Sequence, residues 1–291
     1  MRSGGTDVPV RPPLTARRLR LAVELRKMRE RAGMTATEAA RTLGTSQGQL
    51  SNVESGRFGV SPERVRAMAN IYSCTNQSYI DALADLAAEK TRGHWWDAYR
   101  EVLPSGLLTL AELEHHATAI RTAFTAHIPG MLQTADHARE IFRHAIPAPT
   151  PPEVEHRVSH RVQRQNVVFR ATPNPYSTVI HEAALRMQVG GRDVARAQLE
   201  HLVEMSGRDH ITLRVLPFDI GAFPGSGQTI NYLRGPVPEL DTVQLDQFHG
   251  PVLLDSEAHL EKYRRLLDVV EGLALSPSKS RDLIRSIAQK L

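Results

Sequence analysis

Apolar side chains recur at three- and four-residue spacings through residues 16–89, which is the pattern of amphipathic helices that share one core. The segments between these helices contain residues that typically end or begin a helix. Gly33 and Gly44 can end one, and Ser61-Pro62-Glu63 can begin one. We therefore predict a compact domain of five helices. The apolar positions behind this prediction are Leu21, Leu25, Met28, Ala39, Ala40, Leu43, Leu50, Val53, Val65, Met68, Ile80, Leu83 and Leu86.

Residues 106–291 have a mixed pattern, which predicts an α+β domain with a small sheet. Helices are expected at 107–127, 134–142, 153–169, 194–205, 257–273 and 279–289. Strands are expected at 178–181, 211–216, 229–233, 242–248 and 252–254. The chain as a whole is then mainly α, and α+β in class.

Two further segments set the domain boundaries. The glycines and prolines of residues 1–15 predict a disordered arm. Residues 90–105 hold both tryptophans of the chain, Trp95 and Trp96, so this aromatic connector is expected to dock on something. Either the tryptophans pack against the second domain, or they form a surface for a partner.

The middle of the first domain has the features of a helix-turn-helix. Thr35 or Thr37 can cap a short first helix, and Gly44 can adopt the positive φ at which that helix ends. Ser46 can then cap the second helix, which starts at about Gln47.

That second helix leaves an uncharged polar face outward, because Leu50 and Val53 point back into the domain. Amide groups on such a face can make paired hydrogen bonds with a base edge, as Asn and Gln do with adenine. The residues expected to read bases are Gln47, Gly48, Gln49, Ser51 and Asn52. The residues expected to contact the DNA backbone are Arg17, Arg18, Arg20, Thr35, Thr37, Ser46, Arg57 and Arg64.

Basic residues gather in the same part of the chain. Residues 1–72 contain 13 Lys and Arg against 6 Asp and Glu, a net charge of +7, whereas the whole chain carries +4. The remaining residues therefore carry −3. Cations around a reading surface are what phosphate neutralisation requires, so the charge distribution favours a nucleic-acid partner for the first domain.

The first domain resembles the Xre-type helix-turn-helix family, which includes phage repressors and Cro proteins. The matching residues are Leu21, Ala22, Leu25, Arg26, Met28, Arg29, Gly33, Met34, Thr35, Ala40, Gly44, Ser46, Leu50, Ser51, Val53, Glu54, Ser55 and Gly56. The resemblance implies a structural ion pair between Arg29 and Glu54. It also implies a phosphate-contacting glutamine at a position where this chain has Ala36, so that contact is missing.

The second domain resembles the uncharacterised domain of the antitoxin-like, WhiJ-like regulators of actinobacteria. The matching segments are Ile128 to Thr134, Arg161 to Gln165, His181 to Arg186, Val189 to Gly191, Gln198-Leu199 and Val215 to Phe218. The resemblance implies a transcriptional regulator with a small protein partner encoded nearby. Where that family has a tyrosine-glutamate pair in a late strand, this chain has Val243-Gln244-Leu245-Asp246.

The sequence gives little support to an enzyme. His156 and His160 have a spacing that could hold zinc, but no third ligand accompanies them. The segment 221–227 is rich in glycine but lacks the Lys-Ser/Thr of a phosphate loop, so we expect a flexible hairpin connection there. We therefore expect no catalytic residues, no metal and no cofactor.

Composition is that of an ordinary globular protein, with 41% hydrophobic and 23% charged residues. No apolar run approaches the length of a membrane span, and no signal peptide is evident, so we expect a cytoplasmic protein without a membrane partner. The single cysteine, Cys74, fits a reducing compartment.

Two hypotheses follow for the second domain of a regulator that binds a double-stranded operator as a homodimer. In one, the domain binds a small protein that modulates DNA binding. In the other, it is the receptor of a one-component small-molecule sensor. A closed apolar cavity lined by the sheet would favour the sensor, and an exposed apolar groove or a free sheet edge would favour the protein partner.

Overall fold

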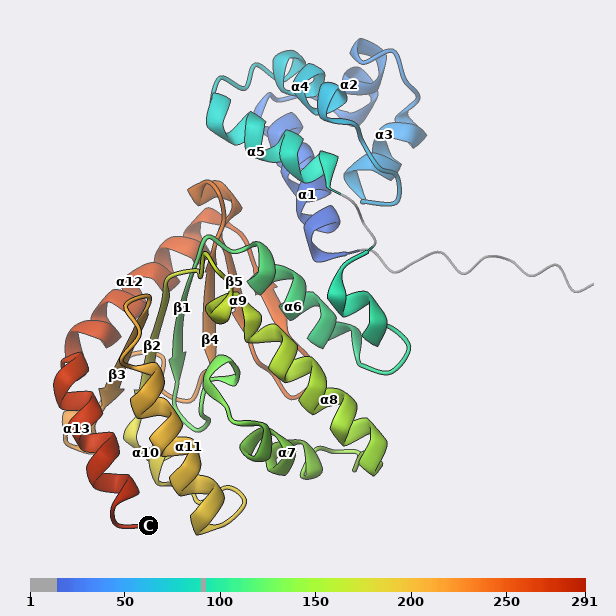
Figure 1. The fold of residues 1–291 in the computed structure, drawn as a ribbon. Helices are drawn as coiled ribbons and strands as arrows, with labels where there is room; N and C mark the ends of the chain where they lie inside the picture. Colours follow the sequence, from blue (N-terminus) through green and yellow to red (C-terminus); the bar gives the residue numbers. More distant parts are fainter. Residues whose placement is uncertain (1–14, 90–92) are drawn as a thin grey trace, which may run out of the picture. The chain divides into compact units, whose positions relative to one another are not determined.

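The computed structural model describes residues 15–89 and 93–291, and the chain divides into two compact units (Figure 1). The first unit lies within residues 1–91 and the second within residues 92–291. The arm predicted for residues 1–15 lies outside the described residues except for Thr15. The Thr15 hydroxyl caps the first helix by accepting a hydrogen bond from the Arg18 amide.

The described part of the first unit consists of five helices, as the apolar spacing predicted. Their bounds are α1 Ala16–Arg31, α2 Ala36–Thr42, α3 Gln47–Glu54, α4 Pro62–Ile71 and α5 Gln77–Ala88. Each helix begins at a side-chain oxygen that accepts a backbone N–H of its first turn, which is a strong local start signal. The capping residues are Thr15, Thr35, Ser46, Ser61 and Asn76.

The turn between α2 and α3 depends on Gly44. Its φ of +63° lies in the left-handed region that favours glycine. The amide of Thr45 donates to the Ala40 carbonyl at 2.9 Å, which satisfies the end of α2 before Ser46 starts α3. The turn thus places α3 across α2 while Leu43 and Leu50 stay buried.

A six-stranded mixed sheet forms the centre of the second unit, with strand order β3-β2-β1-β4-β5-β6. The first three strands pair in parallel, and the others join them antiparallel. Their bounds are β1 Ala119–Phe124, β2 Tyr176–His181, β3 Ile211–Leu216, β4 Ile230–Arg234, β5 Thr242–Leu245 and β6 Val252–Leu254. This confirms the predicted α+β class.

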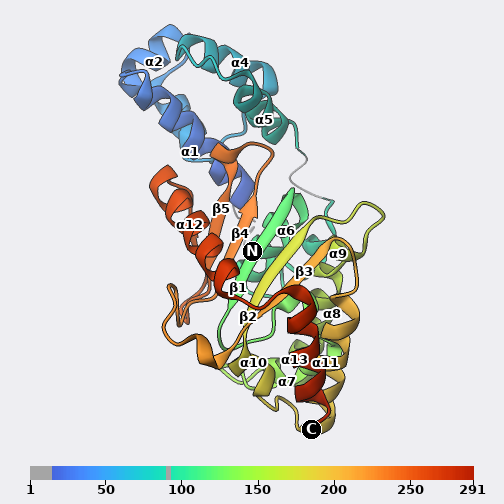
Figure 2. The ribbon, with the colours of Figure 1, turned by 90° about the vertical axis from the view of Figure 1, so that its left-hand side faces the viewer.

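Helices cover both faces of this sheet (Figure 2). The α-helices are α6 Ser105–His116, α7 Ala135–Arg143, α8 Pro151–Arg164, α9 Asn166–Phe169, α10 Glu182–Arg186, α11 Arg192–Met205, α12 Glu257–Leu273 and α13 Pro277–Ala288. Short 3-10 helices are η1 Trp95–Tyr99, η2 Gly130–Leu132, η3 Phe218–Ile220 and η4 Pro238–Leu240. Among the described residues, no helix is both long and apolar enough to cross a membrane.

Side chains of the strands alternate between two cores. On one face, Tyr176 and Ile180 pack with residues of α11, α13 and η2. On the other, Val179 and Tyr232 pack under α12. Since both faces are buried, the central strands have apolar residues pointing in both directions.

The long helix predicted for residues 107–127 is wrong in its second half. The helix α6 ends at His116, and β1 follows as a central strand between β2 and β4. Ile120 and Phe124 stand four residues apart, a spacing that one face of a helix and one face of a strand share. Periodicity therefore could not distinguish the two structures here.

Two connections also differ from expectation. Residues 221–227 lie between β3 and β4, which are separated in the sheet by β2 and β1, so the hairpin prediction is wrong. The tryptophan segment belongs to the second unit, where Trp96 is buried. There the Tyr99 hydroxyl lies 2.8 Å from the Ser159 hydroxyl of α8. The tryptophans thus pack against the second domain.

Two buried histidines make the second domain sensitive to acid. His137 of α7 and His160 of α8 are 3% and 1% exposed, and each has a ring nitrogen without a hydrogen-bond partner in the described part of the chain. Burial, with the nearby cations Arg161 at His137 and Arg164 and Arg161 at His160, lowers their pKa values from 6.5 to about 4 and about 3. Because the unfolded chain takes up protons that the folded domain refuses, we predict that stability falls as the pH drops from 6.5 towards 4.

The expected loss is about 3 kcal/mol for each histidine over that interval. Urea unfolding followed by tryptophan fluorescence measures it, since both tryptophans lie in this domain. His160→Gln should flatten the pH dependence, while His259→Gln, at an exposed position, should leave it unchanged. Equal pH profiles for the wild type and His160→Gln would contradict the assignment.

Candidate functional site

The helix α3 presents the surface that the sequence predicted would read bases. Leu50, at 3% exposure, anchors the helix in the core. The side chains of Gln47, Gln49 and Ser51 are exposed, and Asn52 is half-buried. Gly48 lies on the same outward side and adds no side chain, so a backbone or base edge could approach the helix closely there.

Gln49 has a second role, for which its spacing of three residues from Ser46 was an unused sequence signal. Its side-chain oxygen accepts hydrogen bonds from the Thr45 hydroxyl and from the Ser46 amide, while the Ser46 hydroxyl accepts from the Gln49 amide. This reciprocal capping box starts α3. The amide nitrogen of Gln49, and not its oxygen, therefore remains available to a base.

The threonines of the motif differ in the same way. Thr35 makes a capping box with Glu38, in which its hydroxyl donates to the Glu38 carboxylate at 2.7 Å and accepts from the Glu38 amide at 3.2 Å. Thr37 is exposed in the first turn of α2. Thr35 and Ser46 therefore act first as helix caps, and contact with a DNA backbone would be additional.

The predicted phosphate-contacting arginines are mostly engaged within the domain. Arg17 donates to Glu89 at 2.7 Å, and the Arg18 guanidinium donates to the Arg57 carbonyl at 3.1 Å. Arg64 donates to the Leu43 carbonyl at 2.8 Å, where it caps the end of α2. Among the five predicted arginines, Arg57 has an exposed side chain.

Arg20 fits its predicted role least well. Its side chain is 10% exposed, and its Nε lies 3.0 Å from the Glu24 carboxylate. Glu24 also accepts a hydrogen bond from the Tyr79 hydroxyl at 2.6 Å, so this buried cluster joins α1 to α5. A phosphate contact was expected because Arg20 is one of the cations at the start of the first helix, but its side chain turns inward to Glu24.

The ion pair implied for Arg29 and Glu54 is present in the structure. Two parallel hydrogen bonds of 2.7 and 2.8 Å join the guanidinium to the carboxylate, and the third nitrogen donates to the Met34 carbonyl at 2.7 Å. Both side chains are less than 10% exposed. The hydrogen bond to Glu54 raises the pKa of Arg29. The pair fixes the end of α3 against α1.

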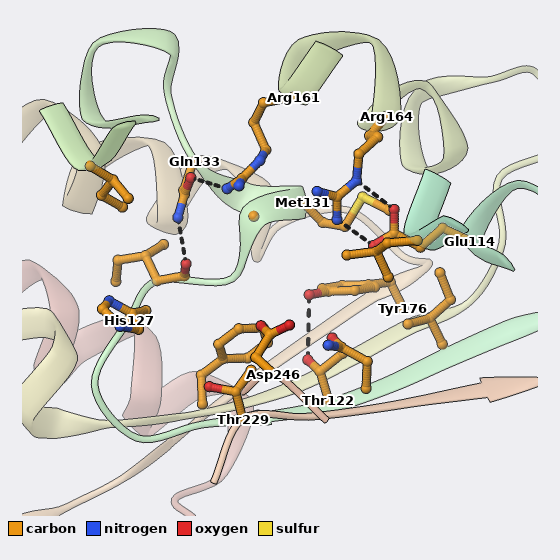
Figure 3. Close-up of a pocket in the computed structure, with 17 residues that line it drawn as sticks. Glu114, Thr122, His127, Met131, Gln133, Arg161, Arg164, Tyr176, Thr229 and Asp246 are labelled. Carbon is orange, nitrogen blue, oxygen red and sulfur yellow. Dashed lines mark hydrogen bonds and ion pairs between the residues drawn. The ribbon is translucent and has the colours of Figure 1, made fainter. Parts of the chain in front are cut away.

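A cavity of about 200 Å³ lies in the second unit between the sheet and its helices (Figure 3). Leu110 and Glu114 of α6, Arg161 and Arg164 of α8, and the η2 segment form one wall. Strands β1, β2 and β4 form the other, together with Asp246 just after β5. The cavity thus combines an apolar lining with several charged groups, which is the usual composition of a small-molecule site.

Arg164 and Glu114 form a closed pair in this wall. The Arg164 guanidinium makes two hydrogen bonds of 2.7 and 2.6 Å to the carboxylate, and both side chains are 5% exposed. Nearby Glu114 outweighs the effect of burial and raises the pKa of Arg164. This pair links α6 to α8, and each of its buried charges neutralises the other.

Arg161, one helical turn earlier, lacks an acidic partner within salt-bridge distance in the described residues. One of its nitrogens donates to the Gln133 side-chain oxygen, and its guanidinium lies 4.8 Å from the centre of the Phe142 ring. Its Nε is buried without a hydrogen-bond partner in the described part of the chain. Burial lowers the pKa of Arg161 to about 9, so the side chain is still a cation at neutral pH.

Three buried glutamines hold the loop beneath Arg161 in place. Gln133 donates to the Ile128 carbonyl at 2.7 Å, and Gln165 donates to the Gln133 carbonyl at 2.7 Å. Gln198 of α11 donates to the Leu132 carbonyl and accepts from the Thr134 amide, at 2.7 and 2.8 Å. The loop from residue 128 to residue 134 is therefore rigidly positioned at the cavity.

Comparison with known proteins assigns both domains. Residues 107–286, which are more than half of the chain, match the family described as domain of unknown function DUF5753. The chain belongs to the DUF5753 family. Residues 20–83 match a family described as a helix-turn-helix domain, which makes the first unit a DNA-binding domain, as the sequence predicted. No curated protein and no solved structure matches the chain.

The geometry explains why distant segments of the DUF5753 domain occur together. The segments at 128–134, 161–165 and 198–199 meet through Gln133, Gln165 and Gln198 around the cavity. The segments at 181–186 and 215–218 meet where Glu182 accepts a hydrogen bond from the Phe218 amide at 3.0 Å. The sequence alone showed the order of these segments but not the contacts that join them.

Sequence reasoning also missed Glu114, Arg161, Arg164 and Asp246 as site residues. A signal was present in α8, where Arg161 and Arg164 continue the buried stripe of Val154 and Val158 at helical spacing. Charged residues in an apolar stripe predict buried charge, and buried charge is frequent at binding sites. Asp246 gave no such signal, because it joins the cavity only through the fold.

The Arg29–Glu54 pair yields a stability prediction for the first domain. Glu54→Ala should lower the free energy of unfolding by about 3 kcal/mol or more, because it leaves a buried guanidinium without its partner. Denaturant unfolding followed by circular dichroism measures the change. Asp81→Ala is the matched control, since the Arg66–Asp81 pair of the same domain is about half exposed and should contribute little. Equal losses for the two variants would contradict the structural role of Glu54.

Proposed function

We propose that this chain is a sequence-specific, Xre-type transcriptional regulator that reads DNA with α3, and that it is not an enzyme. The observation that carries the proposal is the uncharged outward face of α3, composed of Gln47, Gly48, Gln49, Ser51 and Asn52. The core residue Leu50 and the Arg29–Glu54 pair hold this face rigidly. Rigid support is what base readout needs, because paired hydrogen bonds tolerate little displacement.

Regulation is assigned to the DUF5753 domain, acting as the receptor of a small molecule. The cavity beside the sheet supports this function, since it is small, partly apolar and lined by converging polar groups. A ligand in that cavity can control DNA binding only to the extent that it binds the DNA-competent and incompetent states with different affinity.

A protein partner, as in antitoxin-like, WhiJ-like regulators, is the second candidate. One observation favours it: Phe248, 94% exposed, precedes the edge strand β6, and Leu253, 41% exposed, lies within that strand. A partner strand could pair with this edge and bury both side chains. Such binding would depend on Phe248 and Leu253, whereas a small ligand would depend on the residues of the cavity.

Base reading predicts a loss of specificity in α3 variants. Asn52→Ala and Gln47→Ala should each weaken binding to the operator by about 1 to 3 kcal/mol, with little effect on scrambled DNA. Arg57→Ala should weaken binding to both, because a phosphate contact carries no sequence information. Fluorescence anisotropy with matched and scrambled duplexes separates the effects. An equal loss on both duplexes for Asn52→Ala would overturn its assignment as a base-reading residue.

We also expect two copies of the chain on each operator. One recognition helix reads only a few base pairs, so affinity and specificity call for two half-sites. Analytical ultracentrifugation of the complex gives the stoichiometry directly. A single protomer on the minimal operator would contradict the homodimer.

A further inference from the structure

Two opposite charges face each other across the cavity of the DUF5753 domain (Figure 3). Arg161 points into it from α8, and Asp246 points into it from the sheet. Asp246 accepts a hydrogen bond from Gln244 at 2.6 Å, but within residues 15–89 and 93–291 no cation lies within salt-bridge distance of it. Both side chains therefore line the cavity, and they are too far apart to form an ion pair with each other in the described structure.

The other charged groups of the cavity do not share this property. Both carboxylate oxygens of Glu114 accept hydrogen bonds from Arg164. Arg161 is left with one bond to Gln133 and with a buried Nε that lacks a partner in the described residues. A buried donor without an acceptor is destabilising, and more so when the group is charged. A ligand oxygen would bind the guanidinium where Arg161 lines the cavity, and not at the Nε, which is shielded from solvent.

Gly130 shows how closely the guanidinium is placed. A Cβ at this position would lie 2.7 Å from a guanidinium nitrogen of Arg161, closer than side chains tolerate. The backbone at Gly130 therefore lies directly against the guanidinium, and the Gln133 side-chain oxygen accepts a hydrogen bond from it. Arg161 is fixed in orientation before any ligand arrives, which reduces the entropic cost of binding.

We propose that this cavity binds a small zwitterion of the α-amino-acid type, with its carboxylate at Arg161 and its ammonium group at Asp246. The inference rests on the proposed receptor function of the domain. A simple anion would meet the Asp246 carboxylate, and a simple cation would meet Arg161, so a molecule with both charges complements the site best. Leu110, Ile120 and Met131 offer an apolar surface to its side chain.

The volume of the cavity is sufficient for a small ligand. A cavity of about 200 Å³ has room for roughly seven groups the size of a water molecule, which corresponds to a small amino acid. A second hollow, of about 580 Å³ and lined by residues of α6 and of the 244–253 segment, shares Leu110 and Asp246 with the cavity. Asp246 thus stands at the junction between the cavity and a more open groove.

Calorimetric titration of the full chain with each of the twenty proteinogenic L-amino acids tests this proposal. We expect at least one to bind, and its N-acetyl and carboxamide derivatives to bind at least tenfold more weakly, because each lacks one of the two charges. Sodium acetate and sodium phosphate are the comparison anions. If either anion binds as tightly as the best amino acid, or if no amino acid binds, the proposal is wrong.

Variants locate the site. Asp246→Asn and Arg161→Gln should each weaken binding of the responding amino acid at least tenfold. Gly130→Ala should also weaken it by displacing the guanidinium, and this variant keeps every charge in the cavity. Arg265→Gln and Asp193→Asn, at exposed positions, should bind like the wild type. Wild-type affinity in a folded Asp246→Asn variant would overturn the proposal.

Operator binding with and without the responding amino acid separates this inference from the proposed function. If the amino acid binds in the cavity but leaves DNA affinity unchanged, the ligand site stands and the receptor function fails. If no amino acid binds while operator binding is intact, the ligand inference fails and the DNA-reading function stands.

Discussion

A guanidinium that leaves water costs several kcal/mol unless an acceptor replaces its hydration, and this constraint organises both domains of the chain. In the first domain Arg29 meets it through Glu54 and the Met34 carbonyl, and the end of the recognition helix is thereby tied to α1. In the second domain Arg164 meets it through Glu114, which ties α8 to α6. Each pair fixes the relative position of two helices but adds little net stability, because its Coulomb energy mostly offsets the cost of desolvating the two charges.

Arg161 is a cavity-lining guanidinium that, unlike Arg29 and Arg164, has no carboxylate partner among the described residues. It lies one turn from a fully neutralised arginine, yet its Nε has no partner in the described part of the chain. Three buried glutamines hold this arrangement in place. The hydrogen bonds of Gln133, Gln165 and Gln198 fix the loop that packs against the guanidinium. An under-satisfied charge on a rigid support is typical of a site selected for binding and not for stability.

Much of the first domain could be predicted from the sequence because its determinants are local. The caps at Thr35, Ser46 and Ser61 and the turn at Gly44 act within four residues of themselves. The second domain was harder for two physical reasons. The spacing of Ile120 and Phe124 suits a helix and a strand alike, so β1 was missed. The cavity joins residues 114, 161 and 246, which only the folded sheet brings together.

Some polar contacts of the reading surface were not predicted from the sequence. The outward position of Gln47 and Ser51 followed from the burial of Leu50. Gln49 stands three residues after Ser46, which is the spacing of a capping box, and Arg20 stands four residues before Glu24, which is the spacing of a helical ion pair. Spacing alone does not show that Glu24 is buried, and this burial turns Arg20 away from the surface. These details narrow the surface that can reach a base or a phosphate.

Selection of bound sequences from a random duplex library by the full chain tests the central claim most directly. The account predicts enrichment of one inverted repeat, with half-sites about one helical turn apart. Recovery of unenriched, random sequences would contradict a DNA-reading function for α3.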